Sequence, residues 1–126
     1  MPHLRLECSS NIKPEPGFTA IFDELHTALA LTGEIRRSNC KSRAIVAEDF
    51  LIGFGEGQDA FVHLDLRFVE GPGEELKQRL GEEMLSILLR CFEEAIGKYD
   101  TQITVEVRDI TPSAYFKYPD GTLPQQ

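Results

Sequence analysis

Near its start the chain reads His3-Leu4-Arg5-Leu6-Glu7, and the same pattern of residues recurs further along as His63-Leu64-Asp65-Leu66-Arg67. In both stretches leucine alternates with polar or charged residues, which is the period-2 pattern of a strand with one buried face. The second stretch lies inside a longer predicted strand, residues 60–69, and further strands are predicted at residues 42–47 and 102–108. The repeated sequence pattern predicts a fold built from two similar units.

A helical pattern follows each of the two stretches. After the first, apolar residues recur at steps of three and four over residues 18–29, and Gly33 supplies a helix stop. After the second, a longer helix is predicted over residues 74–96. Its predicted buried stripe consists of Leu76, Leu80, Met84, Ile87, Leu88, Cys91, Phe92 and Ala95.

The resulting order is a β-α-β unit written twice, over about residues 2–48 and 60–108, with a tail at 112–126. A right-handed crossover makes the two strands of each unit parallel. We therefore expect one domain over residues 1–126 of the α/β (α+β) class, a tandem β-α-β repeat whose four-stranded sheet carries two helices on one face. The opposite face would stay uncovered in a single chain, which predicts a closed homo-oligomer.

Charge and cysteine usage exclude several classes of protein. With 21 acidic and 13 basic residues the net charge is −8, which argues against a nucleic-acid partner. The chain contains no apolar run of the roughly 18–20 residues that a membrane span needs, and it does not begin like a signal peptide. Its three cysteines, Cys8, Cys40 and Cys91, offer no metal-ligand spacing. We expect reduced thiols, a cytoplasmic location and no metal site.

Four cations, Arg36, Arg37, Lys41 and Arg43, lie close together before and within the second predicted strand. Basic loops are usually solvated surface, and that interpretation stays open. In so acidic a chain the same group also indicates an anion site.

Three glycines, Gly53, Gly55 and Gly57, follow the second strand. The segment lacks the lysine of a phosphate-binding loop and the full GxGxxG pattern, and a strand follows it instead of a helix. It predicts a hairpin or a flexible loop.

Pro2 is a candidate general base. Once Met1 is removed, its nitrogen is a terminal secondary amine at the start of a strand. Terminal amines titrate near neutrality, with a reference pKa of roughly 7.7–8.0 for an α-amino group. Burial and nearby cations lower such a pKa because both disfavour the protonated form. A proline in position two is also common without any catalytic role.

Several short motifs, taken in order, resemble the 5-carboxymethyl-2-hydroxymuconate isomerase family of the tautomerase superfamily. They are Pro2-His3 opening a strand, Glu7-Cys8-Ser9-x-Asn11-Ile12 closing it, Ala60-Phe61-Val62-His63 on the third strand, and Phe116-Lys117 near the end. Each motif is weak alone, but together they span nearly the whole chain.

The resemblance implies a tautomerase-like homotrimer in which Pro2 acts as the base, in a pocket lined partly by neighbouring subunits. It implies an isomerase of homoprotocatechuate degradation, a branch of aromatic hydrocarbon catabolism, acting on a small anionic unsaturated oxo acid without any cofactor. Lys41 and Arg43 would bind substrate carboxylates. Phe116 would pack at the pocket or at a subunit contact, with simple core packing as an open alternative.

The chain also departs from the family pattern. The family usually has Arg-Ser-Arg where this chain has Lys41-Ser42-Arg43, and lysine lacks the planar fork of arginine. It usually has an arginine following a glycine after the third strand, where this chain has Gly71-Pro72-Gly73. Arg36 or Arg37 could compensate for that arginine.

Three functions therefore stay open at this point. The first is the isomerase, the second a non-catalytic trimeric binding protein of the same fold, and the third a small-ligand regulatory domain with a ferredoxin-like layout. The third would need no free proline. His3 and His63 are interpreted as histidines that bond the backbone or fill an interface.

Overall fold

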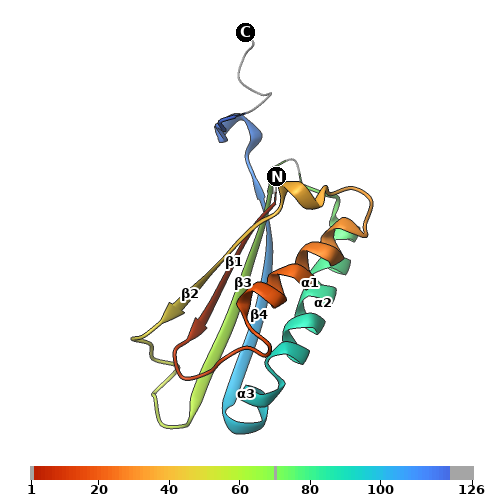
Figure 1. The fold of residues 1–126 in the computed structure, drawn as a ribbon. Coiled ribbons are helices and arrows are strands. Elements are labelled where there is room, and N and C mark those ends of the chain that lie inside the picture. The colour runs from red at the N-terminus through yellow and green to blue at the C-terminus, as the bar shows by residue number, and fades with distance from the viewer. Residues whose placement is uncertain (1, 70, 120–126) are drawn as a thin grey trace.

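The elements of the structure follow the predicted order, and Figure 1 shows their arrangement. The structure is a computed structural model that describes residues 2–69 and 71–119. Its strands and helices are β1 (Pro2–Ser9), α1 (Phe18–Ala30), β2 (Lys41–Ala47), β3 (Asp59–Val69), α2 (Glu74–Cys91), α3 (Glu93–Lys98) and β4 (Asp100–Ile110). Two short 3₁₀ turns, η1 (Arg37–Asn39) and η2 (Pro112–Ala114), precede β2 and follow β4.

The four strands form one sheet in the order β2-β1-β3-β4. β1 is parallel to β2 and β3 is parallel to β4, which confirms the two β-α-β units. The units join through the antiparallel pair β1 and β3, in which His3 lies opposite Arg67 and Leu6 opposite Leu64. Because β2 and β3 are not neighbours, the glycine-containing segment between them is a loop and the predicted alternative of a hairpin is wrong.

Both long helices lie on the same face of the sheet, as Figure 1 shows, and this confirms the predicted α+β architecture. Leu4 and Leu6 of β1 and Leu64 and Leu66 of β3 are fully buried beneath the helices. Every member of the stripe predicted for the second helical pattern is also buried. Burial of this apolar surface supplies the main stabilising term of the fold.

The single helix predicted over residues 74–96 is wrong in one respect, because it breaks at Phe92. α2 ends at Cys91 and α3 begins at Glu93, with Phe92 at φ −110° and ψ 25°. The carbonyl of Cys91 accepts a hydrogen bond of 3.1 Å from the N–H of Glu15, in the connection before α1. A contact from outside the helix thus occupies an acceptor that a continuous helix would use internally.

The other face carries mostly polar and charged side chains, together with the apolar residues Ile45 and Phe61. No helix of the described residues covers this face (Figure 1). Over those same residues, no helix is long and apolar enough to cross a membrane.

Candidate active site

Pro2 lines a cavity of about 230 Å³ at the end of the sheet where β1 begins. Because β1 lies between β2 and β3, its first residue faces the connections that lead into β2 and out of β3. Figure 1 shows the turn η1 beside this end of the strand. The cavity is lined by Pro2, Glu34, Ile35, Arg36, Asn39, Phe68, Val69, Gly71 and Pro72.

Pro2 itself is buried and lies opposite Phe68 in the β1–β3 register. Regular strand pairing therefore fixes the position of the residue that the sequence indicates as a base. Met1, on whose removal that role depends, lies outside the described residues.

The two adjacent arginines before β2 have different surroundings. Arg37 donates to the hydroxyl of Thr27 at 2.8 Å and to the carbonyl of Asp23 at 3.2 Å, and it forms an ion pair with the Asp23 carboxylate. Arg36 lines the cavity, and within the described part of the chain it has no ion pair within 4.0 Å. Among the described residues, Arg36 thus shares the cavity lining with Pro2 and has no ion-pair partner, whereas Arg37 is bound to α1.

Gly71, at the rim of the cavity, allows a close approach of β4. A Cβ atom at this position would lie 2.2 Å from Oδ1 of Asp109, and the other carboxylate oxygen of Asp109, Oδ2, lies 2.8 Å from Nζ of Lys77 in α2. The turn from β3 to α2 can pass this ion pair because position 71 has no side chain.

The predicted anion-binding residues lie on the uncovered face of the sheet, not in the lining of the Pro2 cavity. In the β1–β2 register Lys41 is beside His3, and Arg43 is beside Arg5. The guanidinium of Arg43 donates to Nδ1 of His3 at 3.2 Å. Within one chain the structure brings Lys41 and Arg43 close to His3 and does not bring them into the cavity with Pro2.

Phe116 is 81% exposed and is likewise absent from the cavity lining. Its neighbour Tyr115 is half-buried, and the hydroxyl of Tyr115 lies 2.7 Å from Nε2 of His3. The segment that carries Phe116 is thus fastened to β1 by Tyr115, a residue that the sequence analysis did not select.

His3 lies between the guanidinium of Arg43 and the hydroxyl of Tyr115. Burial lowers its pKa below the ordinary histidine value, and the nearby charges of Arg43 and Lys41 lower it further. A guanidinium can only donate, so Nδ1 of His3 is the acceptor and the proton resides on Nε2, which donates to Tyr115. His3 is therefore a neutral link between β2 and the segment after β4.

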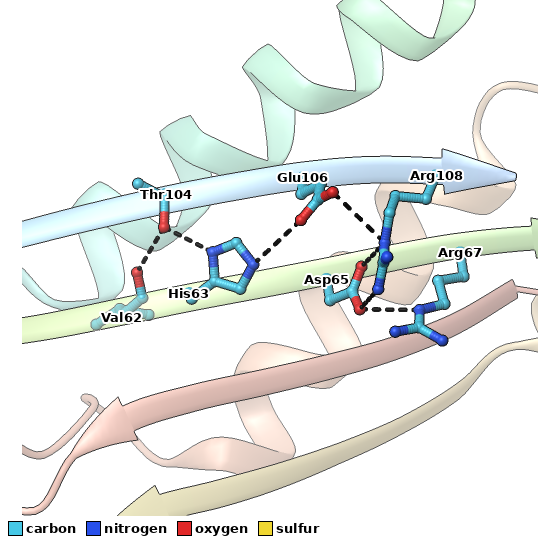
Figure 2. Close-up of polar contacts among 7 residues, drawn as sticks. All are labelled: Val62, His63, Asp65, Arg67, Thr104, Glu106 and Arg108. Atoms are coloured by element: carbon cyan, nitrogen blue, oxygen red, sulfur yellow. Dashed lines mark hydrogen bonds and ion pairs between the residues drawn. The ribbon is translucent and has the colours of Figure 1, made fainter. Parts of the chain in front are cut away.

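Further along the uncovered face, Asp65 is only 7% exposed and lies between two arginines (Figure 2). Arg67 Nε and Arg108 Nη2 donate to the same oxygen of Asp65, at 2.9 and 2.8 Å. Burial alone would raise the pKa of Asp65, but the hydrogen bonds from Arg108 and Arg67, together with their charges, lower it overall. Both guanidiniums pair with this buried carboxylate, and Arg108, which lies on β4, also joins that strand to β3.

His63 lies in the same network, and Figure 2 shows it between Thr104 and Glu106. Its Nδ1 is 2.7 Å from the hydroxyl of Thr104, and its Nε2 is 3.7 Å from a carboxylate oxygen of Glu106. Neither His3 nor His63 is among the residues that line the Pro2 cavity. Over residues 2–69 and 71–119, no group of three or more His, Cys, Asp and Glu side chains is arranged to hold a metal ion.

The role of Arg36 was undecided from the sequence alone, and the lining residues Asn39 and Ile35 were not among the predicted site residues. A usable signal was present in the predicted topology. In a right-handed β-α-β unit the helix runs back along the sheet, so the connection into the second strand lies at the end where the first strand begins. The topology could therefore have placed residues between Gly33 and Lys41 near Pro2, although no such prediction was made.

Comparison with known proteins gives matches along nearly the whole chain. The sequence model described as 5-carboxymethyl-2-hydroxymuconate isomerase matches residues 2–120. A 5-carboxymethyl-2-hydroxymuconate Delta-isomerase of Escherichia coli is 26% identical over 117 residues, which are 93% of each chain.

Solved structures give a consistent result. A 5-carboxymethyl-2-hydroxymuconate isomerase from Deinococcus radiodurans R1 superposes with a TM-score of 0.84 at 25% identity, covering 94% of this chain and 90% of that one. The W0 fused 4-OT wild type symmetric trimer has a TM-score of 0.67 at 14% identity, over 90% of this chain and 91% of that one, and is similar in fold alone.

Proposed function

The chain belongs to the 5-carboxymethyl-2-hydroxymuconate isomerase family, and from this membership we propose that it converts a carboxylated 2-hydroxydienoate into its 2-oxo-enoate isomer. Family membership makes it an isomerase of the tautomerase superfamily. The proposed substrate is of the kind named for the relative from Escherichia coli. Its metabolic setting would be the breakdown of homoprotocatechuate.

The observation that carries the proposal is the position of Pro2, buried at the start of β1 and yet part of a cavity wall that includes Arg36. With Met1 removed, the nitrogen of Pro2 takes the proton of the 2-hydroxyl group. The electron pair of that O–H bond forms the carbonyl, the conjugated double bonds shift, and the far carbon receives the proton from the prolinium. The base is regenerated, and the step needs no oxidant or reductant.

We further propose that the active molecule is a closed homotrimer of single-domain chains. The uncovered, charged face of the sheet and the edge strands β2 and β4 support an assembly in which copies cover one another. The fused 4-OT relative of the same fold is a symmetric trimer. In such an assembly Lys41, Arg43 and Phe116 would act on the substrate held at Pro2 of a neighbouring copy.

The test compares three forms of the chain: the trimmed protein, the Pro2→Ala variant, and a form with a short uncleaved amino-terminal extension. The extension retains every side chain but turns the nitrogen of Pro2 into an amide. Ketonisation of 2-hydroxymuconate is followed by ultraviolet absorbance, and the intact mass verifies each amino terminus. General base catalysis contributes about 10²–10⁴-fold, so both altered forms should lose at least about 10²-fold in kcat/KM.

Unchanged turnover in either altered form would reject Pro2 as the base. If the trimmed wild-type protein binds a dicarboxylate but turns over no 2-hydroxydienoate, the non-catalytic binding protein takes the place of the isomerase.

A further inference from the structure

We infer that Arg36 binds a carboxylate of the ligand in the Pro2 cavity, taking the part of the arginine that the segment Gly71-Pro72-Gly73 lacks. This inference deepens the proposed function and rests on the Pro2 cavity being the ligand site. It gives a role to one member of the basic group that precedes β2.

The first support is the contrast between two neighbouring arginines. Three contacts to Asp23 and Thr27 commit the guanidinium of Arg37 to α1. Arg36, one residue earlier, lines the cavity instead. Identical side chains in adjacent positions thus have different surroundings, and only one of them is beside Pro2.

The second support is that the backbone of Arg36 is fixed. Its carbonyl accepts a hydrogen bond of 2.9 Å from the N–H of Asn39, which closes the turn η1, and the thiol of Cys40 lies 3.7 Å from the same oxygen. The side chain therefore extends from an ordered turn at the cavity wall. A fixed attachment point reduces the conformational entropy lost when the guanidinium binds an anion.

The third support is the charge of the cavity wall. Among the described residues that line the cavity, Arg36 is the one cation and Glu34 is the one carboxylate. In a chain of net charge −8, a ligand carboxylate in this cavity has one attractive partner there, and Glu34 repels it from the adjoining part of the wall. Arginine also suits this role because its planar fork forms two parallel hydrogen bonds to a carboxylate.

The cavity lining also includes Gly71 and Pro72, which carry no charge. Arg36 accordingly selects ligands that present a carboxylate to the η1 side of the cavity. The chemical class is a small unsaturated dicarboxylate, one end of which binds Arg36 while the reacting carbons lie beside Pro2.

The test measures binding and turnover separately. Binding of cis,cis-muconate, a dicarboxylate without the 2-hydroxyl group, is measured by titration calorimetry on the trimmed full-length protein. The variants are Arg36→Gln, Arg36→Lys and, as the matched control, Arg37→Gln. Circular dichroism and light scattering verify that each variant keeps its fold and assembly.

A charge-assisted hydrogen bond to a carboxylate corresponds to roughly 10- to 100-fold in affinity. Arg36→Gln should weaken muconate binding by about that factor and raise KM for 2-hydroxymuconate more than it lowers kcat. Arg36→Lys, which keeps the charge without the fork, should fall in between. Arg37→Gln should bind muconate as the wild type does.

Equal muconate affinities of Arg36→Gln and Arg37→Gln, or no measurable binding by the wild type, would overturn the assignment of Arg36. The expected order of affinities without turnover by any form would support Arg36 and reject the isomerase function. The expected turnover without a separate effect of Arg36→Gln would reject Arg36 and leave the isomerase intact.

Discussion

At the scale of single residues, Pro2 and His3 are adjacent in β1 but lie on opposite faces of the sheet. Pro2 lines the cavity, while the next side chain points to the opposite face and holds Arg43 and Tyr115. A protonated His3 would carry hydrogen on both ring nitrogens and could not accept from Arg43. It would also add a charge beside Arg43, Lys41 and Arg67.

This arrangement predicts a stability that falls in acid. The pKa of His3 is lowered in the folded chain from a reference value of 6.5. Below about pH 6.5 the unfolded chain binds a proton that the folded chain does not, so the free energy of unfolding decreases until the pH passes the folded pKa. Urea unfolding at about pH 7.5 and about pH 5 should show a smaller loss for His3→Gln than for the wild type.

His26 needs a separate control because burial, and then the charge of Arg37, also lower its pKa, and its Nε2 lies 2.6 Å from the hydroxyl of Ser42. The variant His26→Gln measures that contribution. An acid-dependent loss as large in His3→Gln as in the wild type would contradict the role assigned to His3.

At the scale of elements, the break between α2 and α3 illustrates what periodicity detects and what it does not. The apolar stripe keeps one continuous spacing across the break, and its residues Leu88, Cys91, Phe92 and Ala95 are buried. At the interruption, the carbonyl of Cys91 accepts a hydrogen bond from the N–H of Glu15, a residue far away in the chain. Local hydrophobic periodicity cannot predict a contact between residues so far apart in the chain.

Phe92, at the break, is fully buried and should be among the most sensitive positions of the helical layer. Truncation of a buried phenylalanine leaves a cavity and typically costs about 3–5 kcal/mol. Phe92→Ala should lower the free energy of unfolding by about that amount in urea titrations at one fixed chain concentration. Leu89→Ala, at a position 45% exposed one turn earlier, should cost about 1 kcal/mol or less. Similar losses of unfolding free energy at both positions would mean that the packing of Phe92 does not contribute specially to stability at the break.

At the scale of the whole molecule, the two β-α-β units were predictable because each strand and helix has a clear apolar period. The sequence did not specify how the units join, since the antiparallel pairing of β1 with β3 depends on contacts across the middle of the chain. The site was predictable in part. Pro2 followed from its position and from the family motifs, whereas the choice between Arg36 and Arg37 required the contacts of Arg37 with α1.

The separation of Arg43 from the Pro2 cavity within one chain leads to a prediction about assembly. Light scattering should give the mass of three chains. Mixed trimers are purified through two different carboxyl-terminal tags, one on Pro2→Ala chains and one on Arg43→Gln chains. If Arg43 of one copy acts at the Pro2 of a neighbouring copy, these trimers should contain some sites in which both residues are intact. Such mixed trimers should be clearly more active than either parent.

If the mixed trimers are no more active than the parents, then either Arg43 and Pro2 act together within one chain or Arg43 is not part of the site. A monomer in light scattering would reject the assembly itself.

The tandem arrangement of the two β-α-β units bears on how many proposed Pro2 sites one chain can hold. The two β-α-β units point in opposite directions, so the second unit begins, at Asp59, at the other end of the sheet from Pro2. A cavity of about 370 Å³ lies at that end too, beside Asp59 and Tyr99. The nitrogen of Asp59 is a peptide amide within the chain and cannot act as a base. Doubling the unit has therefore doubled the architecture without adding a second terminal amine. If Pro2 is the base, as proposed, a titration of active sites should count one per chain, or one for every two β-α-β units.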